Sequence, residues 1–585
     1  MGARVEVNRL SWKIGGEAGY GIMSAGTIFA KTCTRLGLNV FATNDYPSLI
    51  RGGHNTYIVR AEQDKKIGCH LEAVDLLVAF NDESISLHKD ELTHEGGIVY
   101  DGDKVDIKKF QIRKDLKLFH VPMFQLATEA GEKKVVQNTV AIGASLALLD
   151  CEKEIIYSVI KDIFKRKGEK IVQSNINMID AGYNFIRQNY IDHKFNHKLK
   201  KINSEKRIVL TGNDAISAAA IKAGCKFVSI YPMTPTSNIL HFMADKELDY
   251  NIIVKQPEDE IAAINFAIGA SHAGVRAMTA TSGGGFSLMV ESVGLAAMTE
   301  TPLVIVMGQR GGPSTGLPTK TEQGDLRFVM HASQGDFPRI IIAPGDVEEC
   351  FYETFNAFNI ADKYQCPVFI LVDKFVCESM KSTKPFDTSN LKTDRGAILS
   401  EKNLQNLDYQ RFSITDSGIS PRVLPGTRDG IFMTTSDEHT EYGLYNEEPE
   451  LRKKLMDKRM RKLETFRKEM PLPLIYGDEN ADITIISWGS NKQPILEAIE
   501  FLRNDKVKAN FVNLVYIFPF PTERVIEILD KAKKSIIVEM NYSGQMEGLI
   551  KEYTGRSIGH HIRKYEGVPF TSDEIYLKIK EILKR

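Results

Sequence analysis

Short apolar runs alternate with longer amphipathic stretches along most of the chain, and the alternation is clearest in the middle. Seven strand-like runs lie between Arg207 and Asp373, namely RIVL, KFVSIY, NIIVK, RAMTAT, PLVIVMG, RIIIAP and PVFILVD, and helix-length stretches separate them. Short apolar strands joined by helices are typical of a parallel sheet that is covered on both faces. The pattern therefore predicts a doubly wound α/β domain over residues 207–375.

The blocks on either side follow the same rule less regularly. Residues 1–190 open with an apolar stretch, a glycine loop and a helical pattern, SWKIGGEAGYGIMSAGTIFAKTC. Residues 471–585 alternate helices with the runs ADITIISWGS, KANFVNLVYIF and KSIIVEMN, which predicts a smaller doubly wound domain. A chain of 585 residues is too long for one hydrophobic core. We therefore expect a multidomain α/β protein.

Two connecting stretches lack such periodicity. Residues 191–206 are polar and basic, which predicts a linker. Residues 376–470 are mostly irregular and too long for an ordinary loop, so we expect them to pack along another domain or subunit. The charged end of this stretch, from Glu450 to Met470, is predicted to be a solvated basic helix.

Composition narrows the class of protein. The formal net charge of -1 predicts no nucleic-acid partner, and no apolar run reaches the length of a bilayer span. The amino-terminal segment lacks a signal-peptide core, which favours the cytoplasm. The seven cysteines form no CxxC pair, so we expect buried thiols and no metal site in this chain: Cys33, Cys69, Cys151, Cys225, Cys350, Cys366 and Cys377.

The string YPMTPTS, residues 231–237, is the most specific motif. It follows a predicted strand and leads directly into a predicted helix. Hydroxyl groups at such a turn can cap the helix, and we favour that role for Thr236 and Ser237. Thr234 stands at the carboxyl end of the strand, where α/β sheets bind their ligands, so a ligand contact is the better interpretation there.

Two further motifs carry charged side chains. Glu258, Asp259 and Glu260 open a helix, where the dipole favours acids, but the pattern E-x-x-A-x-x-x-A-x-G sets Glu260 apart. We favour a catalytic role for it over simple helix stabilisation. Arg310 follows the run PLVIVMGQ and can bind a carboxylate through two parallel hydrogen bonds, although an ordinary surface ion pair is the alternative.

Other glycine-rich and histidine signals are weaker. The run from Gly15 to Gly21 does not have the G-x-G-x-x-G spacing, so a tight turn and a phosphate-binding loop explain it equally well. The same two interpretations remain open for the segment RGGHN, which begins at Arg51. The glycines 283–285 either let the chain pass close to a cofactor or cap a strand. His439 is more often a satisfied loop histidine than a base.

Taken together, the motifs resemble a known family. YPMTPTS is similar to the YPITP-type signature in the α subunits of 2-oxoacid:ferredoxin oxidoreductases. QPEDEIAAINFAIGASHAG, TATSGGGFSLM, GQRGGPSTGLPT, ISPRVLPG, DEHTEYG and VEMNYSGQM resemble the same family, in its order. GGEAGYGI and RGGHN resemble the γ subunit that many members carry fused to the front of α. The resemblance covers nearly the whole chain.

The resemblance implies an architecture and a set of roles. It implies a γ-like domain at residues 1–190, a pyrimidine-type thiamine-diphosphate-binding domain at 207–375 and a transketolase C-terminal-like domain at 471–585. Glu260 would bind the aminopyrimidine ring of thiamine diphosphate, and Arg310 with Thr234 and Thr319 would hold the 2-oxoacid. Further contacts are implied for thiamine diphosphate at Tyr231, Pro232 and Gly284, and for coenzyme A at Gly16, Gly19, Gly21 and Arg51.

The chain has no GDG motif of the kind that holds Mg²⁺ and the diphosphate. The family places that motif and a [4Fe–4S] cluster on a β subunit, which implies an αβ or (αβ)2 enzyme that reduces ferredoxin. The implied reaction converts a 2-oxoacid, such as pyruvate or 2-oxoglutarate, to acyl-coenzyme A and carbon dioxide. The alternatives are a different thiamine-dependent decarboxylase or dehydrogenase component and a non-catalytic nucleotide-binding regulatory module.

Overall fold

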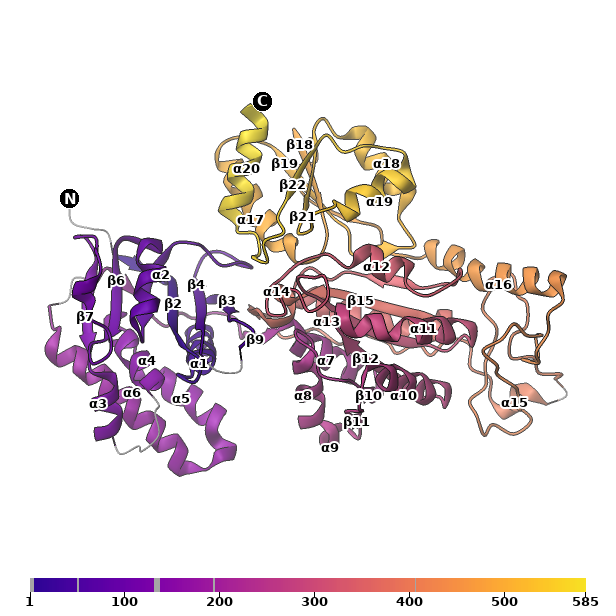
Figure 1. Cartoon of the computed structure of the whole chain (residues 1–585), viewed down its shortest axis with the longest axis horizontal. Helices are drawn as coiled ribbons and strands as arrows, with labels where there is room; N and C mark the ends of the chain where they lie inside the picture. The colour runs from indigo at the N-terminus through magenta and orange to yellow at the C-terminus, as the bar shows by residue number, and fades with distance from the viewer. Residues whose placement is uncertain (1–4, 50–51, 131–136, 193–194, 406, 585) are drawn as a thin grey trace. The chain divides into compact units, whose positions relative to one another are not determined.

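The computed structural model describes residues 5–49, 52–130, 137–192, 195–405 and 407–584, which form two compact units (Figure 1). The first unit contains Met1–Leu210, Glu378–Pro385 and Thr571–Asp573, and the second contains Thr211–Cys377, Phe386–Phe570 and Glu574–Arg585. No described helix is long and apolar enough to cross a membrane. All seven cysteine side chains are buried, as expected.

The first unit is built on a sheet in the order β7-β6-β5-β2-β4-β3-β16-β9. Strands β2, β5, β6 and β7 run parallel, whereas β4, β3 and β16 continue the sheet in antiparallel fashion. The strands are β2 (Arg9–Glu17), β3 (Asn39–Asp45), β4 (His54–Glu62), β5 (Val74–Ala79), β6 (Leu92–Asp101), β7 (Lys117–Val121), β9 (Ile208–Thr211) and β16 (Met380–Thr383).

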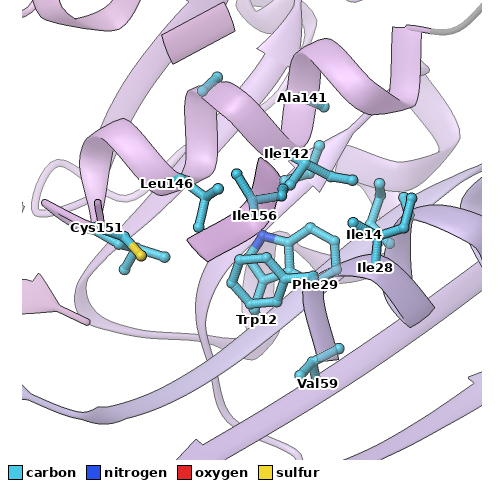
Figure 2. Packing of buried hydrophobic residues seen from close by; sticks show 14 of the residues in the cluster. Trp12, Ile14, Ile28, Phe29, Val59, Ala141, Ile142, Leu146, Cys151 and Ile156 are labelled. Atoms are coloured by element: carbon cyan, nitrogen blue, oxygen red, sulfur yellow. The ribbon is translucent and has the colours of Figure 1, made fainter. Parts of the chain in front are cut away.

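Helices cover this sheet, and all of them except α2 (Asp82–His88) contribute to the core that Figure 2 shows in part. The others are α1 (Ile22–Arg35), α3 (Met123–Glu129), α4 (Gln137–Leu148), α5 (Lys153–Phe164) and α6 (Glu169–Asn189). The ring of Trp12 stacks on Phe29 with 4.3 Å between centroids. A Cβ atom at Gly143 would lie 2.1 Å from the carbonyl oxygen of Ile179, so glycine is what lets α4 and α6 pack this closely.

Two predictions about the segment that follows were wrong. The stretch predicted as a linker packs on the first unit, where Phe195 and Leu199 are buried and β8 (His197–Lys198) pairs with β1 (Glu6–Val7). Isolated apolar residues in a basic stretch gave no periodic signal. The run RIVL forms β9, which lies in the sheet of the first unit rather than in the middle sheet.

The second unit contains the predicted parallel sheet, in the order β11-β10-β12-β13-β15-β14-β20. The first six strands are parallel: β10 (Cys225–Ser229), β11 (Ile253–Lys255), β12 (Arg276–Thr281), β13 (Leu303–Gln309), β14 (Ile340–Ile342) and β15 (Pro367–Asp373). Helices α10 (Glu260–His272), α11 (Gly283–Met298) and α12 (Leu326–His331) share a core with one face. Helices α7 (Gly212–Lys222) and α13 (Val347–Tyr364) pack together on the other face (Figure 1).

The carboxyl-terminal part of the second unit has its own sheet, in the order β17-β19-β18-β21-β22. Its strands are β17 (Leu474–Gly477), β18 (Ile483–Ser487), β19 (Ala509–Asn513), β21 (Ser535–Glu539) and β22 (His560–Arg563), with helices α17 (Lys492–Asn504), α18 (Thr522–Lys531), α19 (Gln545–Thr554) and α20 (Ser572–Lys584). Strand β20 (Tyr516–Phe518) leaves this domain and pairs antiparallel with β14 at the edge of the larger sheet.

Helix α16 (Pro449–Arg467) forms near the predicted range, but it is not a solvated helix. The ammonium groups of Lys458 and Lys462 are fully buried, and both form ion pairs with the buried carboxylate of Glu300. Burial of one acid with two amines is tolerated because the charges compensate one another. In the connector before α16, Arg422 binds the buried Asp362 of α13 at 2.6 Å. The connector is therefore anchored to the middle domain, as its length suggested.

Candidate functional site

The predicted site residues gather where β10, β12 and β13 end. Parallel strands present their carboxyl ends at the same edge of a sheet, and α/β folds bind ligands there. The turn after β10 carries the motif YPMTPTS, α11 begins directly after β12, and the loop after β13 begins with Arg310. Segments far apart in the sequence thus meet at one edge of the sheet.

The turn after β10 is packed tightly against β13. A Cβ atom at Gly308 would lie 2.6 Å from Cγ2 of Thr236, so only glycine fits beneath the turn. The Asn213 side chain donates a hydrogen bond to the carbonyl oxygen of Pro235 at 2.8 Å. Thr236 occupies the cap position of α8 (Ser237–Asp245), but its hydroxyl donates to the carbonyl oxygen of Met233, 3.1 Å away, instead of capping the helix.

Glu260 is the first residue of α10 and is 4% exposed. Its neighbour Asp259 caps the helix by accepting the Ala262 N–H at 2.8 Å, which agrees with the helix-stabilising interpretation of that acid. Glu260 lies against the start of α11, because a Cβ atom at Gly285 would come within 2.6 Å of its Oε1. The glycine run therefore makes room for the buried carboxylate.

Arg310 lies beside the turn after β10. Its Nη1 donates to the carbonyl oxygen of Thr234 at 2.9 Å. No described carboxylate comes within salt-bridge distance of Arg310, so an ordinary surface ion pair does not explain it. Burial lowers the pKa of this guanidinium, and the charge of Asp325 partly opposes that effect. The side chain remains a cation with hydrogen-bonding capacity to spare.

Two carboxylates in this region were missed by the sequence reasoning. Burial raises the pKa of Asp325 to about 6, although the charge of Arg310 lowers it. The pKa of Glu322 is raised to about 7, first by burial and then by the charge of Asp325. A Cβ atom at Gly283 would lie 3.0 Å from Oδ2 of Asp325, which places this carboxylate at the start of α11. Two acids three residues apart, just after a predicted binding loop, are the signal that could have found them.

Glu322→Gln should raise the melting temperature at pH 8, by about 1 °C for an effect on the order of 1 kcal/mol in a unit of this size. The pKa of Glu322 is near 7 in the folded chain against an ordinary value of 4.5, so its ionisation opposes folding as the pH rises towards 7 and above. Solvent screens this half-exposed side chain, which keeps the effect small. Thermal melts at pH 8 and pH 4.5 test this, with the exposed Glu500→Gln as control. An equal shift at both pH values would contradict it.

Several buried polar atoms at this edge of the sheet have no hydrogen-bond partner in the described part of the chain. They are Ser229 Oγ, Thr279 Oγ1, Ser282 Oγ and Gln309 Nε2. Gln309 uses its other side-chain atom to accept the Asp325 N–H at 3.0 Å. Buried polar groups are rarely left without partners, so this concentration points to a ligand.

The other predicted residues occupy the same turns and loops. Tyr231 and Pro232 are half-buried in the turn after β10. Gly284 is exposed at the start of α11, where a Cβ atom would lie 3.9 Å from Cε of Met233. Thr319 is buried in the loop after Arg310. Contacts join the turn after β10 to Arg310 and to the start of α11, whereas no hydrogen bond joins Thr319 to Arg310 in the part of the chain that the structure describes.

In the first unit, the glycine loop forms a tight connection between β2 and α1. Gly19 and Gly21 have positive φ angles of 100° and 73°, which favour glycine, and Gly21 caps α1. The Asn138 side chain donates to the carbonyl oxygen of Gly21 at 3.1 Å. Gly16 is the penultimate residue of β2 and lies against Phe80, where a Cβ atom would come within 3.1 Å of the Phe80 Cβ, and Arg51 lies outside the described residues. This geometry accounts for a tight turn and leaves room for the phosphate-binding interpretation.

Family models match three parts of the chain. Residues 218–458 match the thiamine-diphosphate-binding domain of pyruvate flavodoxin/ferredoxin oxidoreductases, residues 11–185 match the pyruvate ferredoxin/flavodoxin oxidoreductase domain, and residues 481–575 match core domain II of pyruvate:ferredoxin oxidoreductase. The fold and the site therefore define a thiamine-diphosphate-binding oxidoreductase chain.

Individual relatives narrow the class. The α subunit of a 2-oxoacid:ferredoxin oxidoreductase from Saccharolobus solfataricus is 34% identical, with 99% of this chain and 98% of the relative covered. The KorA subunit of 2-oxoglutarate synthase from Methanothermobacter thermautotrophicus is 38% identical over 58% of this chain and 88% of its own length. A solved 2-oxoglutarate:ferredoxin oxidoreductase from Magnetococcus marinus, with 2-oxoglutarate, coenzyme A and succinyl-CoA bound, superposes with a TM-score of 0.89 at 32% identity and covers 98% of this chain and 99% of its own. The chain belongs to the 2-oxoacid:ferredoxin oxidoreductase family.

Proposed function

We propose that this chain is the α subunit of an enzyme that converts a 2-oxoacid and coenzyme A to acyl-coenzyme A and carbon dioxide. The two electrons released by the oxidation leave one at a time to ferredoxin. Pyruvate and 2-oxoglutarate are the substrates to test first, because the matching family model is named for pyruvate and a relative is named for 2-oxoglutarate. The domain boundaries predicted outside residues 191–211 stay predictions within this proposal.

The placement of Arg310 carries the proposal. Its guanidinium is half-buried, hydrogen-bonded to the carbonyl oxygen of Thr234 and without an acidic partner at salt-bridge distance among the described residues. A guanidinium that is held in this way can offer two parallel N–H groups to a carboxylate. The hydroxyl groups of Thr234 and Thr319 would then bind the neighbouring keto oxygen, which fixes the orientation of a 2-oxoacid.

The residues at this edge fit thiamine diphosphate. Glu260 is a buried carboxylate beside a glycine run, and the partnerless Ser282 hydroxyl and Gln309 amide provide hydrogen-bonding capacity for a polar ring. Tyr231, Pro232 and Gly284 would line the same space. When bound, the cofactor supplies the carbon nucleophile and the electron sink that decarboxylation of a 2-oxoacid needs. Glu260 would hold and return a proton at the aminopyrimidine ring, and Arg310 would orient the substrate.

Helices α10 and α11 present an apolar surface that suits a partner subunit. Ile261, Phe266 and Leu288 are 47%, 51% and 50% exposed, and Gly269 and Gly284 on the same helices are exposed as well. Apolar side chains that lie exposed near one another often mark a protein–protein contact, and small residues let another helix approach closely. We assign this surface to a β subunit that contributes Mg²⁺, the diphosphate-binding motif and the [4Fe–4S] cluster, in an αβ or (αβ)2 enzyme.

Coenzyme A is assigned to the glycine loop of the first unit. The N-terminus of α1 and the positive φ angles of Gly19 and Gly21 are features that favour a phosphate group, and Gly16 and Arg51 belong to the same proposed contact. The bound coenzyme A of the Magnetococcus marinus relative supports the use of this cosubstrate. We place the enzyme in the cytoplasm.

Arg310→Lys should lower kcat/KM for 2-oxoacids by about 10- to 150-fold, because a lost bidentate contact to a carboxylate costs roughly 1.5–3 kcal/mol. Binding of thiamine diphosphate to the αβ complex should stay unchanged. Steady-state kinetics with pyruvate, 2-oxoglutarate and a branched 2-oxoacid test this prediction. Arg428→Lys, at a guanidinium that is 84% exposed, is the matched control. An unchanged kcat/KM for all three substrates would remove Arg310 from the substrate site.

A further inference from the structure

The loop that begins with Arg310 is fastened at its far end to the carboxyl-terminal domain. Gln323 is fully buried and takes part in five hydrogen bonds with residues of that domain. Its backbone N–H donates to the carbonyl oxygen of Met540 at 2.7 Å, and its side-chain oxygen accepts the Met540 N–H at 3.1 Å. Its side-chain amide donates to the carbonyl oxygen of Trp488 at 3.0 Å, while Asn491 and Asn541 donate to its two oxygens at 2.9 and 3.2 Å.

A second glutamine adds to this attachment from the start of α19. The Gln545 side chain donates to the carbonyl oxygen of Gly324 at 2.6 Å and accepts the Arg327 N–H at 2.9 Å. Asn541 orients this helix start by accepting the N–H groups of Gly544 and Gln545. The segment 540–545 therefore forms hydrogen bonds with the loop on both sides of Gly324.

The hydrogen bonds around Gly324 are linked, through Asp325, to the end of the loop that begins with Arg310. Asp325 immediately follows Gly324, and its charge acts on Arg310. The backbone of Asp325 is also tied to Gln309, the residue before Arg310. At the other end, Gly311 bonds to the carbonyl oxygen of Lys320, which closes the intervening loop. Displacement at Gly324 would thus reach Asp325 and then the guanidinium of Arg310.

We propose that the segment 540–545 is a positioning element for 2-oxoacid binding, with Gln545 and Gln323 as the positioning residues. This inference rests on the proposed function, in which Arg310 holds the substrate carboxylate. The carboxyl-terminal domain then acts on the reaction through the loop, without supplying a catalytic residue. Holding a binding group in its productive geometry before the substrate arrives lowers the cost of binding.

The test uses the complete αβ enzyme with Gln545→Ala, which removes two side-chain hydrogen bonds to the loop. We expect kcat/KM for the 2-oxoacid to fall about ten-fold, mainly through a higher KM, while KM for coenzyme A stays unchanged. In an Arg310→Lys background the same change should cost less than about two-fold, because both residues act on one contact. Asn510→Ala is the control, since this buried amide in the same domain bonds to Asp478 and not to the loop.

The outcomes separate this inference from the proposed function. An unchanged kcat/KM in Gln545→Ala, or a full ten-fold loss that is retained in the Arg310→Lys background, would overturn the positioning role and leave the function standing. If Arg310→Lys alone has no effect, the substrate role of Arg310 fails, and the positioning role fails with it. Gln545→Glu keeps the acceptor for Arg327 and loses the donor to Gly324, so it replaces the alanine variant if that enzyme does not assemble.

Discussion

Complexes that carry Glu260→Gln are expected to lose a factor of about 10² to 10⁴ in turnover, the range typical of a positioned acid–base group. The fold and the subunit assembly should persist, because glutamine has nearly the same shape. The carboxylate is 4% exposed, and glycine at position 285 leaves it room where a side chain would collide with it. Glutamine can occupy that space but cannot take and return a proton.

The neighbouring acids provide the matched controls. Asp259 caps α10 and Glu258 precedes the helix, so Asp259→Asn and Glu258→Gln should change stability by only a few tenths of a kcal/mol and leave turnover near normal. The measurement is hydrogen–deuterium exchange at the thiazolium carbon of thiamine diphosphate in the three variant complexes. Exchange at the parental rate in Glu260→Gln, together with slow exchange in either control, would show that another carboxylate does this work.

Phe266→Glu is expected to prevent assembly with the β subunit. The Phe266 side chain is 51% exposed on α10 and belongs to the apolar surface that we assign to the partner. A carboxylate buried there without a partner would weaken association at least 100-fold, or about 3 kcal/mol. The isolated chain should show no 2-oxoacid-dependent reduction of ferredoxin, and added β subunit should restore the reaction in the parent but not in the variant.

Leu577→Glu is the control for this substitution, because Leu577 is an apolar residue of α20 with a similar exposure of 58%. Titration of each variant with β subunit, followed by sedimentation and by activity, gives the comparison. Equal affinity of the Phe266→Glu variant and the parent for the β subunit would place the interface elsewhere on the chain. A circular-dichroism melt confirms that each variant is folded before the titration.

The pattern of apolar runs predicted most of the second unit. Six of the seven runs in the middle block form the expected parallel sheet, because buried strands carry a strong local signal. The seventh, at Ile208–Thr211, has the same local character, and tertiary pairing decides which sheet it joins. Helix α16 was predicted near its range but with the wrong environment, since the buried partner of Lys458 is Glu300, 158 positions away.

The site was predicted in part, for a similar reason. Thr234 and Arg310 stand at strand ends, so their role follows from topology, and the structure joins them by a hydrogen bond. Gln323 lies far along an irregular loop, where no period or spacing marks it, and the only local signal for Asp325 is the second acid three residues before it. Asp325 lies against Gly283, and Gln323 binds the carboxyl-terminal domain. Both partners are distant in the sequence and come near only in the folded chain.

Strand β20 joins the two parts of the second unit, although they are separate stretches of the sequence. It belongs to the carboxyl-terminal part of the sequence but closes the open edge of the larger sheet, and one hydrophobic core contains residues of both parts. An uncovered edge strand invites pairing with other chains. Separation of the two parts by truncation would therefore leave the edge of β14 unpaired and the shared core exposed, so we expect the two parts to unfold together.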